Sequence, residues 1–85
     1  MRVRVLYFAS VRERLGHEQE WLDFPRPACT VDELERTLAG RGAAWAQVFG
    51  TGSKLLAAVN QTMARRDTTL ADGDEVAFFP PVTGG

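Results

Sequence analysis

The sequence predicts a small α+β domain in which one main helix packs against a mixed β-sheet. Apolar and polar residues alternate near both ends of the chain, as they do in strands, and apolar residues recur at helical spacing in the middle. At 85 residues, the chain is close to the smallest size at which an apolar core holds a fold without disulfides or metal ions. We therefore expect one domain over residues 1–81, followed by an extended, flexible tail over residues 82–85.

The beginning of the chain has the pattern of a strand, a short helix and a second strand. Residues 2–8 alternate with the period of two that is typical of a strand. Ser10 and Glu13 have the spacing of a capping box, which predicts that a short helix begins at Ser10. Gly16 can adopt the left-handed conformation that ends a helix, and residues 18–24 then predict the second strand.

A second capping box, formed by Thr30 and Glu33, predicts the start of the main helix. The helix is expected to end near residues 40–42, where two glycines flank an arginine that suits the negative end of the helix dipole. Apolar residues at spacings of three and four form its predicted inner face: Val31, Leu34 and Leu38.

The second half of the chain predicts one more short helix and several strands. Residues 45–49 have the apolar spacing of a helical turn, and the glycine-rich residues 50–53 predict a loop. Residues 55–59 are a continuous apolar run of strand length. Residues 60–61 then offer a turn into a short edge strand at residues 63–65.

The last strand is predicted at residues 75–79, after a tight turn at Asp72, Gly73 and Asp74. A metal site or an acid–base pair is the alternative for the two aspartates. They lack the further ligands of a calcium loop, so the turn is favoured. Two prolines at residues 80–81 have no backbone N–H to donate, and they end the strand.

This order of strands around one crossover helix fits the β-grasp, the fold of ubiquitin, with short extra helices. A ferredoxin-like fold is the alternative. It requires a second comparable helix near the end of the chain, where residues 67–74 leave room for one turn only. The β-grasp is therefore the preferred topology.

Composition argues against several classes of function and location. The formal net charge is −1 and the arginines are spread along the chain, so no one-signed surface is predicted to bind nucleic acid. No stretch approaches the roughly 18 apolar residues that a membrane span needs. A single cysteine excludes an internal disulfide and fits a reducing compartment, so we expect a cytoplasmic protein.

The residues most often used in catalysis form no recognisable site. Cys29 is interpreted as a buried structural thiol rather than a nucleophile, because no catalytic cysteine signature surrounds it. His17 follows a helix-ending glycine and is interpreted as a solvent-facing loop residue. Lys54 could approach a phosphate or a partner's carboxylate, but a lone lysine is usually a solvated charge, so it stays unassigned. No metal site is predicted.

Residues 55–60 and residues 72–85 resemble the small, sulfur-carrying subunits of molybdopterin synthase. The resemblance extends to the N-terminal part in residues 7–9, 12–13 and 16. The C-terminal run, Asp-Gly-Asp-Glu-Val-Ala-Phe-Phe-Pro-Pro-Val-Thr-Gly-Gly, is its most specific part. Members of this family share the fold of ubiquitin and act with protein partners.

The resemblance implies that the chain carries sulfur at its last residue. The carboxylate of Gly85 would be adenylated by an E1-like enzyme that uses ATP, and a sulfur donor system would then convert it to a thiocarboxylate. The large synthase subunit, in a heterotetramer of two small and two large subunits, would transfer that sulfur to a cyclic pyranopterin precursor. The chain itself would bind no cofactor, nucleic acid or membrane, and catalysis would belong to its partners.

The tail residues before Gly85 have a steric role in this interpretation. A Cβ at Gly84 would restrict the backbone as the tail enters a narrow channel of the partner, so glycine gives access. The stiff Pro80 and Pro81 direct Val82 and Thr83 away from the sheet and reduce the entropy that the tail loses on binding.

Three apolar side chains are expected to contact the partner. By strand alternation, Phe8 and Phe79 point away from the face that carries the core residues of their strands, and Met63 lies on the neighbouring edge segment. In the resembling family these positions correspond to partner contacts. The alternative is that they are ordinary scattered surface or core residues.

Three other functions remain open from the sequence. A ubiquitin-like modifier joined to lysines of target proteins would share the adenylation step. A sulfur carrier for thiamine thiazole synthesis shares the Gly-Gly end, but the run from Phe78 to Thr83 favours the molybdopterin pathway. A plain interaction domain would be indifferent to the loss of Gly85.

Overall fold

The computed structural model of this protein describes residues 1–81. The sequence-based assignments for Val82, Thr83, Gly84 and Gly85 therefore lie outside the described residues. In chain order the elements are β1 (Arg2–Tyr7), α1 (Ala9–Leu15), β2 (Gln19–Asp23), β3 (Ala28–Thr30), α2 (Val31–Ala39), α3 (Ala43–Phe49), β4 (Leu56–Val59), β5 (Thr62–Ala64), β6 (Thr69–Ala71) and β7 (Glu75–Phe79).

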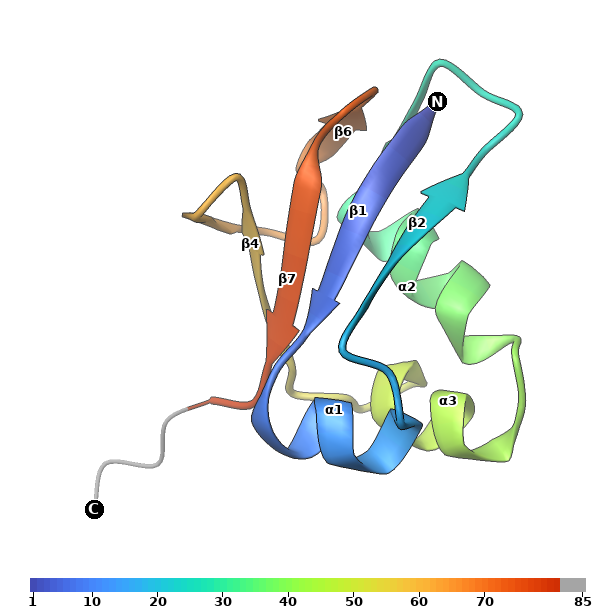
Figure 1. Ribbon diagram of the computed structural model, residues 1–85, viewed down its shortest axis with the longest axis vertical. Coiled ribbons are helices and arrows are strands. Elements are labelled where there is room, and N and C mark those ends of the chain that lie inside the picture. Colours follow the sequence, from blue (N-terminus) through green and yellow to red (C-terminus); the bar gives the residue numbers. More distant parts are fainter. Residues whose placement is uncertain (82–85) are drawn as a thin grey trace.

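The main sheet has the strand order β2-β1-β7-β4-β5. The central neighbours β1 and β7 are parallel, and the other neighbouring pairs are antiparallel. In Figure 1, α2 lies behind the sheet, and the face turned toward the viewer carries no helix among the described residues. This mixed sheet with one crossover helix confirms the predicted β-grasp topology.

The core lies between the covered face of the sheet and the helices. Alternate residues of β1 and β7 point into it, and α2 contributes the inner face that its spacing predicts. Burying one such side chain contributes roughly 1.5–3 kcal/mol to folding. The fully or almost fully buried residues of these three elements are Val3, Val5, Tyr7, Val31, Leu34, Leu38, Val76 and Phe78.

The capping box of α2 is confirmed. The Glu33 N–H donates to Thr30 Oγ1 at 3.1 Å, and the Thr30 N–H donates to Glu33 Oε1 at 3.1 Å. Two backbone donors that the helix itself leaves unpaired are thereby satisfied. The helix ends at Ala39 with Gly40 as its C-cap, as the glycines predict.

The capping box predicted at Ser10 is wrong. Helix α1 begins one residue earlier, its N-cap is Phe8, and the cap has no side-chain hydrogen bond. The reason lies in the sheet, because the Phe8 N–H donates to the carbonyl of Phe78 at 3.1 Å while the Val11 N–H donates to the Phe8 carbonyl at 3.1 Å. The hydrogen bond between Phe8 and β7 therefore fixes the start of α1 at Ala9, before Ser10. Gly16 ends the helix in the left-handed conformation, as expected.

A small second sheet, β3 with β6, is absent from the sequence-based prediction, which places no strand at residues 28–30 or 69–71. Its register places Cys29 opposite Leu70. Both side chains are buried, which confirms the interpretation of Cys29 as a buried thiol, and burial raises the pKa of that thiol. Within residues 1–81 no helix is long and apolar enough to cross a membrane.

Candidate functional site

The candidate site is the uncovered sheet face together with the point where the chain leaves β7. Side chains that are paired across neighbouring strands project on the same side of a sheet. The register therefore gathers apolar residues from four strands on one face. The pairs are Leu6 with Ala77, Phe79 with Leu56, and Ala58 with Met63.

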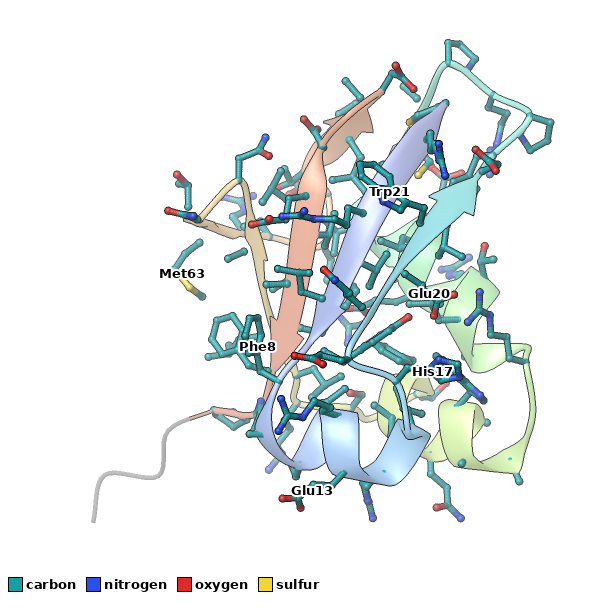
Figure 2. All side chains as sticks on the ribbon, viewed as in Figure 1. Phe8, Glu13, His17, Glu20, Trp21 and Met63 are labelled. Atoms are coloured by element: carbon teal, nitrogen blue, oxygen red, sulfur yellow. The ribbon has the colours of Figure 1, made fainter. Side chains whose placement is uncertain are left out.

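All three predicted contact residues lie on this apolar face. Met63 is 59% exposed and Phe8 is 47% exposed, whereas Phe79 is half-buried between its neighbours. Phe8 continues the alternation of β1 in extended conformation, so it points to the same side as Leu6. Figure 2 shows Phe8 and Met63 near the β4–β7 side of the sheet. The structure thus brings together residues that are far apart in the sequence.

Sequence reasoning missed two exposed residues of the same face. Leu56 is 36% exposed and extends the apolar face beside Phe79. Trp21 is 49% exposed at the other end of the face, where the Arg2 guanidinium lies 4.9 Å from its ring centroid. The run of residues 55–59 is apolar throughout, so only strand pairing reveals which of its side chains point outward.

The polar groups beside the apolar face pair with one another. Arg4 on β1 forms an ion pair with Glu75 on β7. The Asn60 side chain donates to Asp74 Oδ1 at 3.0 Å and accepts the Glu75 N–H at 3.0 Å. These contacts leave an apolar centre with a satisfied polar margin, which is the usual anatomy of a protein interface.

The turn before β7 uses its two aspartates to hold backbone groups. Asp72 accepts the Arg2 N–H at 2.8 Å, and Asp74 accepts the Ala71 N–H at 2.8 Å. Gly73 has a φ of +87°, a conformation that disfavours residues with a Cβ. The turn prediction is confirmed. Among residues 1–81 no group of three or more His, Cys, Asp or Glu side chains could hold a metal ion.

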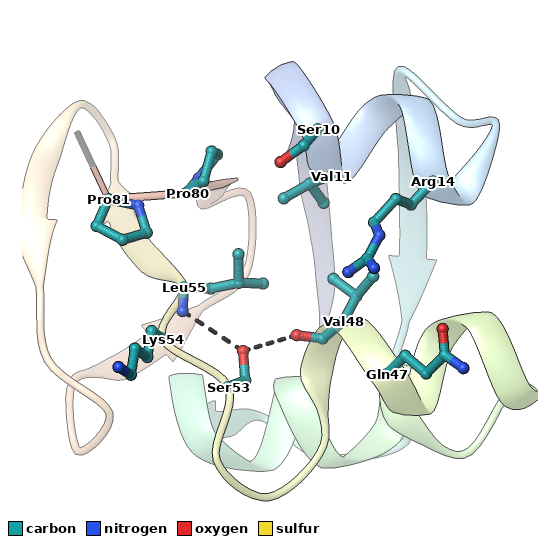
Figure 3. Close-up of a pocket in the computed structure, with 10 residues that line it drawn as sticks. All are labelled: Ser10, Val11, Arg14, Gln47, Val48, Ser53, Lys54, Leu55, Pro80 and Pro81. Atoms are coloured by element: carbon teal, nitrogen blue, oxygen red, sulfur yellow. Dashed lines mark hydrogen bonds between the residues drawn. The ribbon is translucent and has the colours of Figure 1, made fainter. Parts of the chain in front are cut away.

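A pocket of about 210 Å³ lies beside the tail root, which we define as Pro80 and Pro81. It is bounded by α1, α3 and the segment of residues 53–55 (Figure 3). Ser53 fixes that segment, because its hydroxyl donates to the Val48 carbonyl at 2.6 Å and accepts the Leu55 N–H at 3.4 Å. Ser53, the last residue of the predicted loop at residues 50–53, therefore lines the pocket beside the tail root.

A second polar cluster lies at the β2 edge of the sheet. Tyr7 donates its hydroxyl hydrogen to Glu20 at 2.8 Å, and Arg41 donates to both Glu20 oxygens at 2.8 and 2.9 Å. The Arg41 guanidinium also lies 4.7 Å from the Trp45 ring centroid. His17 is exposed, as predicted, and its ring lies 5.5 Å from that of Trp45.

The electrostatics of this cluster favour a charged Glu20. Burial alone would raise the pKa of Glu20, but the hydrogen bonds from Arg41 and Tyr7 outweigh it and lower that pKa below its ordinary value. Burial, assisted by the Glu20 carboxylate, raises the pKa of Tyr7. Tyr7 therefore stays a neutral donor, and the cluster joins β2 to the connection after α2.

Comparison with known proteins gives full-length matches. The ThiS family model matches residues 5–85. The molybdopterin synthase sulfur carrier subunit of Escherichia coli is 51% identical, with 98% of this chain and 99% of that protein covered. The Haemophilus influenzae protein of the same name is 42% identical over the same shares. The crystal structure of SAMP1 from Haloferax volcanii superposes with a TM-score of 0.81 at 29% identity and covers both chains fully.

Proposed function

Since this chain belongs to the ThiS family, we propose that it is a sulfur carrier of molybdenum cofactor biosynthesis and delivers sulfur to a cyclic pyranopterin precursor of molybdopterin. Relatives matched over almost their whole length support this function by their names. The structural observation that carries the proposal is the end of β7, where Phe79 lies on the exposed apolar face and the tail root follows directly. A partner that binds the face therefore meets the start of the tail.

The reactive group in this proposal is the carboxylate of Gly85, the last residue of the sequence. A terminal carboxyl group has an ordinary pKa of about 3.5, so it is an anion and a poor electrophile at neutral pH. In the first step a carboxylate oxygen attacks the α-phosphorus of ATP, and pyrophosphate leaves. Sulfur at the oxidation level of sulfide, supplied by the donor, then attacks the acyl carbon and AMP leaves, taking one carboxylate oxygen with it. The product is a thiocarboxylate.

The thiocarboxylate is the nucleophile of the second stage. Its sulfur bonds to a carbon of the precursor while a carbon–oxygen bond of that carbon breaks and the oxygen leaves. Water then hydrolyses the resulting thioester, which leaves a thiol on the precursor and returns the carboxylate. Two loaded carriers in succession supply the two sulfurs of the dithiolene. The carrier is thus a regenerated co-substrate, and the catalytic groups belong to its partners.

We expect two protein partners for this cycle. One is an E1-like adenylating enzyme, and the other is the large synthase subunit, in a heterotetramer of two small and two large chains. Gly84 lets the backbone approach the catalytic groups of each partner, because a Cβ would restrict it. The exposed apolar face supplies binding energy that a short tail cannot, since ordering the tail costs conformational entropy.

Intact-mass measurement tests the proposal directly. The purified chain is incubated with ATP, a sulfur donor and the adenylating enzyme of the same organism. Exchange of one carboxylate oxygen for sulfur adds about 16 Da, the difference of the two atomic masses, and we expect this adduct on the C-terminal peptide. A chain that lacks Gly85 serves as the control and should stay unmodified. No adduct on the full chain, with an enzyme shown to be active, would reject the carrier function.

A ubiquitin-like modifier is the second candidate, favoured by the likeness to SAMP1, a small archaeal modifier protein. The same incubation distinguishes the two fates when a cell extract is added. Lysine-linked products of higher mass indicate a modifier, whereas a thiocarboxylate that a large subunit consumes indicates the carrier. A carrier of thiamine thiazole synthesis would instead yield its sulfur to a thiazole synthase and not to the large subunit.

A further inference from the structure

The pocket beside the tail root combines an apolar floor with two cationic side chains. Val11, Val48 and Leu55 line its apolar part. Arg14 at the end of α1 and Lys54 after α3 are the charged residues of its lining, and both are cations. Figure 3 shows Arg14 reaching from α1 toward Val48, with Lys54 on the other side of the pocket, the side on which Leu55, Pro80 and Pro81 lie. The pocket therefore offers positive charge beside the tail root.

Glu13 and Glu18 are the acidic residues closest to Arg14 in sequence, and among the described residues neither forms an ion pair with it. Glu18, the acid nearest to α1 on its C-terminal side, pairs with Arg12 at 3.7 Å. Within residues 1–81 neither Arg14 nor Lys54 forms an ion pair or a side-chain hydrogen bond. Every other arginine among residues 1–81 differs in this respect, since each has an acidic partner.

Local structure explains one of the two cations only in part. The helix dipole favours a cation in the last turn of α1, and this accounts for the presence of Arg14 there. It does not account for Lys54, which lies in a connection outside any helix. Nor does it account for the direction of the Arg14 side chain over the apolar lining. A negatively charged group of a partner protein would account for the position of Lys54 and for the direction of the Arg14 side chain.

We propose that this pocket receives an acidic side chain of the large synthase subunit and that the Arg14 and Lys54 pair selects the protein that holds the tail. The inference rests on the proposed function. Pro80 and Pro81 form one wall of the pocket, so a protein that grips the residues after them must lie against it. A carboxylate suits the site, because a guanidinium can bind it through two parallel hydrogen bonds while a lysine adds a point charge.

The pocket is a docking site and not part of the reacting centre. Four residues separate Pro81 from the end of the sequence, and four extended residues span at most about 14 Å. A partner that holds the tail extended places the reacting carboxylate well beyond hydrogen-bond distance of Arg14. The pocket can therefore determine which protein binds, and how fast, without touching the transferred sulfur.

Affinity for the large subunit of the same organism tests this inference by calorimetry. The double variant Arg14→Glu/Lys54→Glu is compared with Arg26→Glu/Arg36→Glu, which makes the same change in net charge away from the tail root. We expect the first variant to bind about tenfold or more weakly at about 0.05 M salt, and the loss to shrink at about 0.5 M salt because charge pairs are screened. The matched control should change affinity less than about twofold, in line with the small effect of distant exposed charges.

The outcomes separate this inference from the proposed function. Thermal melts confirm that each variant is folded, and Met63→Glu on the apolar face reports on the main interface. If Met63→Glu weakens binding and the pocket variant binds like the unmodified chain, the pocket inference is wrong and the proposed function stands. Tighter binding of the pocket variant would also overturn it, because the pocket would then hold the chain's own anionic end. No binding by the unmodified chain would overturn both.

Discussion

Glu20 is the residue on which the β2 edge of the sheet depends, because it accepts hydrogen bonds from Tyr7 and from both terminal nitrogens of Arg41. We expect Glu20→Gln to lower the free energy of unfolding by about 1.5–3 kcal/mol at neutral pH, the usual contribution of a hydrogen bond to a charged group. Glutamine keeps one oxygen for Tyr7, so the loss reports mainly on the ion pair. Urea unfolding measures the difference.

The pH dependence of that difference follows from the lowered pKa of Glu20. A carboxylate whose pKa is lower in the folded state stabilises the fold above its unfolded pKa, and this stability is lost as the pH falls through the folded pKa. The gap between the original chain and Glu20→Gln should therefore be full near pH 7 and shrink below about pH 4.3, the ordinary pKa of glutamate. A gap that is constant from neutral to acidic pH would contradict the role of the charge.

Single residues also show how far the sequence could predict the site. Phe8 and Phe79 belong to strands with clear alternation, so their outward direction could be predicted, and the structure confirms it. Leu56 lies in an uninterrupted apolar run, and its direction depends on pairing with Phe79 from a strand about twenty residues away. The Arg14 and Lys54 pair was also beyond prediction, because a tertiary pocket brings the two together.

Among the elements, the two capping-box patterns offer a matched test. Thr30 has the full box and Ser10 has none, although both precede a glutamate by three residues. We expect Thr30→Ala to cost about 1 kcal/mol of stability, as N-cap removal usually does. Ser10→Ala should stay within about 0.5 kcal/mol, as for most surface substitutions. Equal losses in urea unfolding would mean that the serine caps α1 after all.

The elements that sequence reasoning missed are the shortest ones. β3 and β6 have three residues each, too few to show a period of two, and β6 directly precedes the turn before β7. Their pairing continues into the start of α2, where the Val31 N–H donates to the Thr68 carbonyl and the Asp32 N–H to the Arg66 carbonyl, at 3.0 and 2.9 Å. Tertiary hydrogen bonds therefore decide these strands, whereas α2, β1 and β7 follow from their own patterns.

At the scale of the whole molecule, the fold separates stability from reactivity. The core cluster consists of buried side chains, among them Val3 on β1 and Phe78 on β7. The exposed apolar face and the pocket both adjoin the tail root, the face through Phe79 and the pocket through its lining residues Pro80 and Pro81. In the proposed cycle both partners bind the same tail root, so one carrier would serve only one of them at a time. Under the two proposals, the face and the pocket determine which partner binds. Their residues come together only in the folded chain, so partner choice could not be predicted from the order of elements as the topology could.

This separation predicts that adding one alanine after Gly85 abolishes adenylation without unfolding the domain. The added residue moves the carboxylate by one position and places a Cβ where glycine stood, so the mass adduct of about 16 Da should disappear. The midpoint of thermal unfolding should move by less than about 3 °C, because no residue of the core cluster is altered. Leu34→Ala is the matched core control and should cost about 2–5 kcal/mol. Retention of the adduct by the extended chain, or a loss of stability like that of Leu34→Ala, would show that reactivity and folding are not separate.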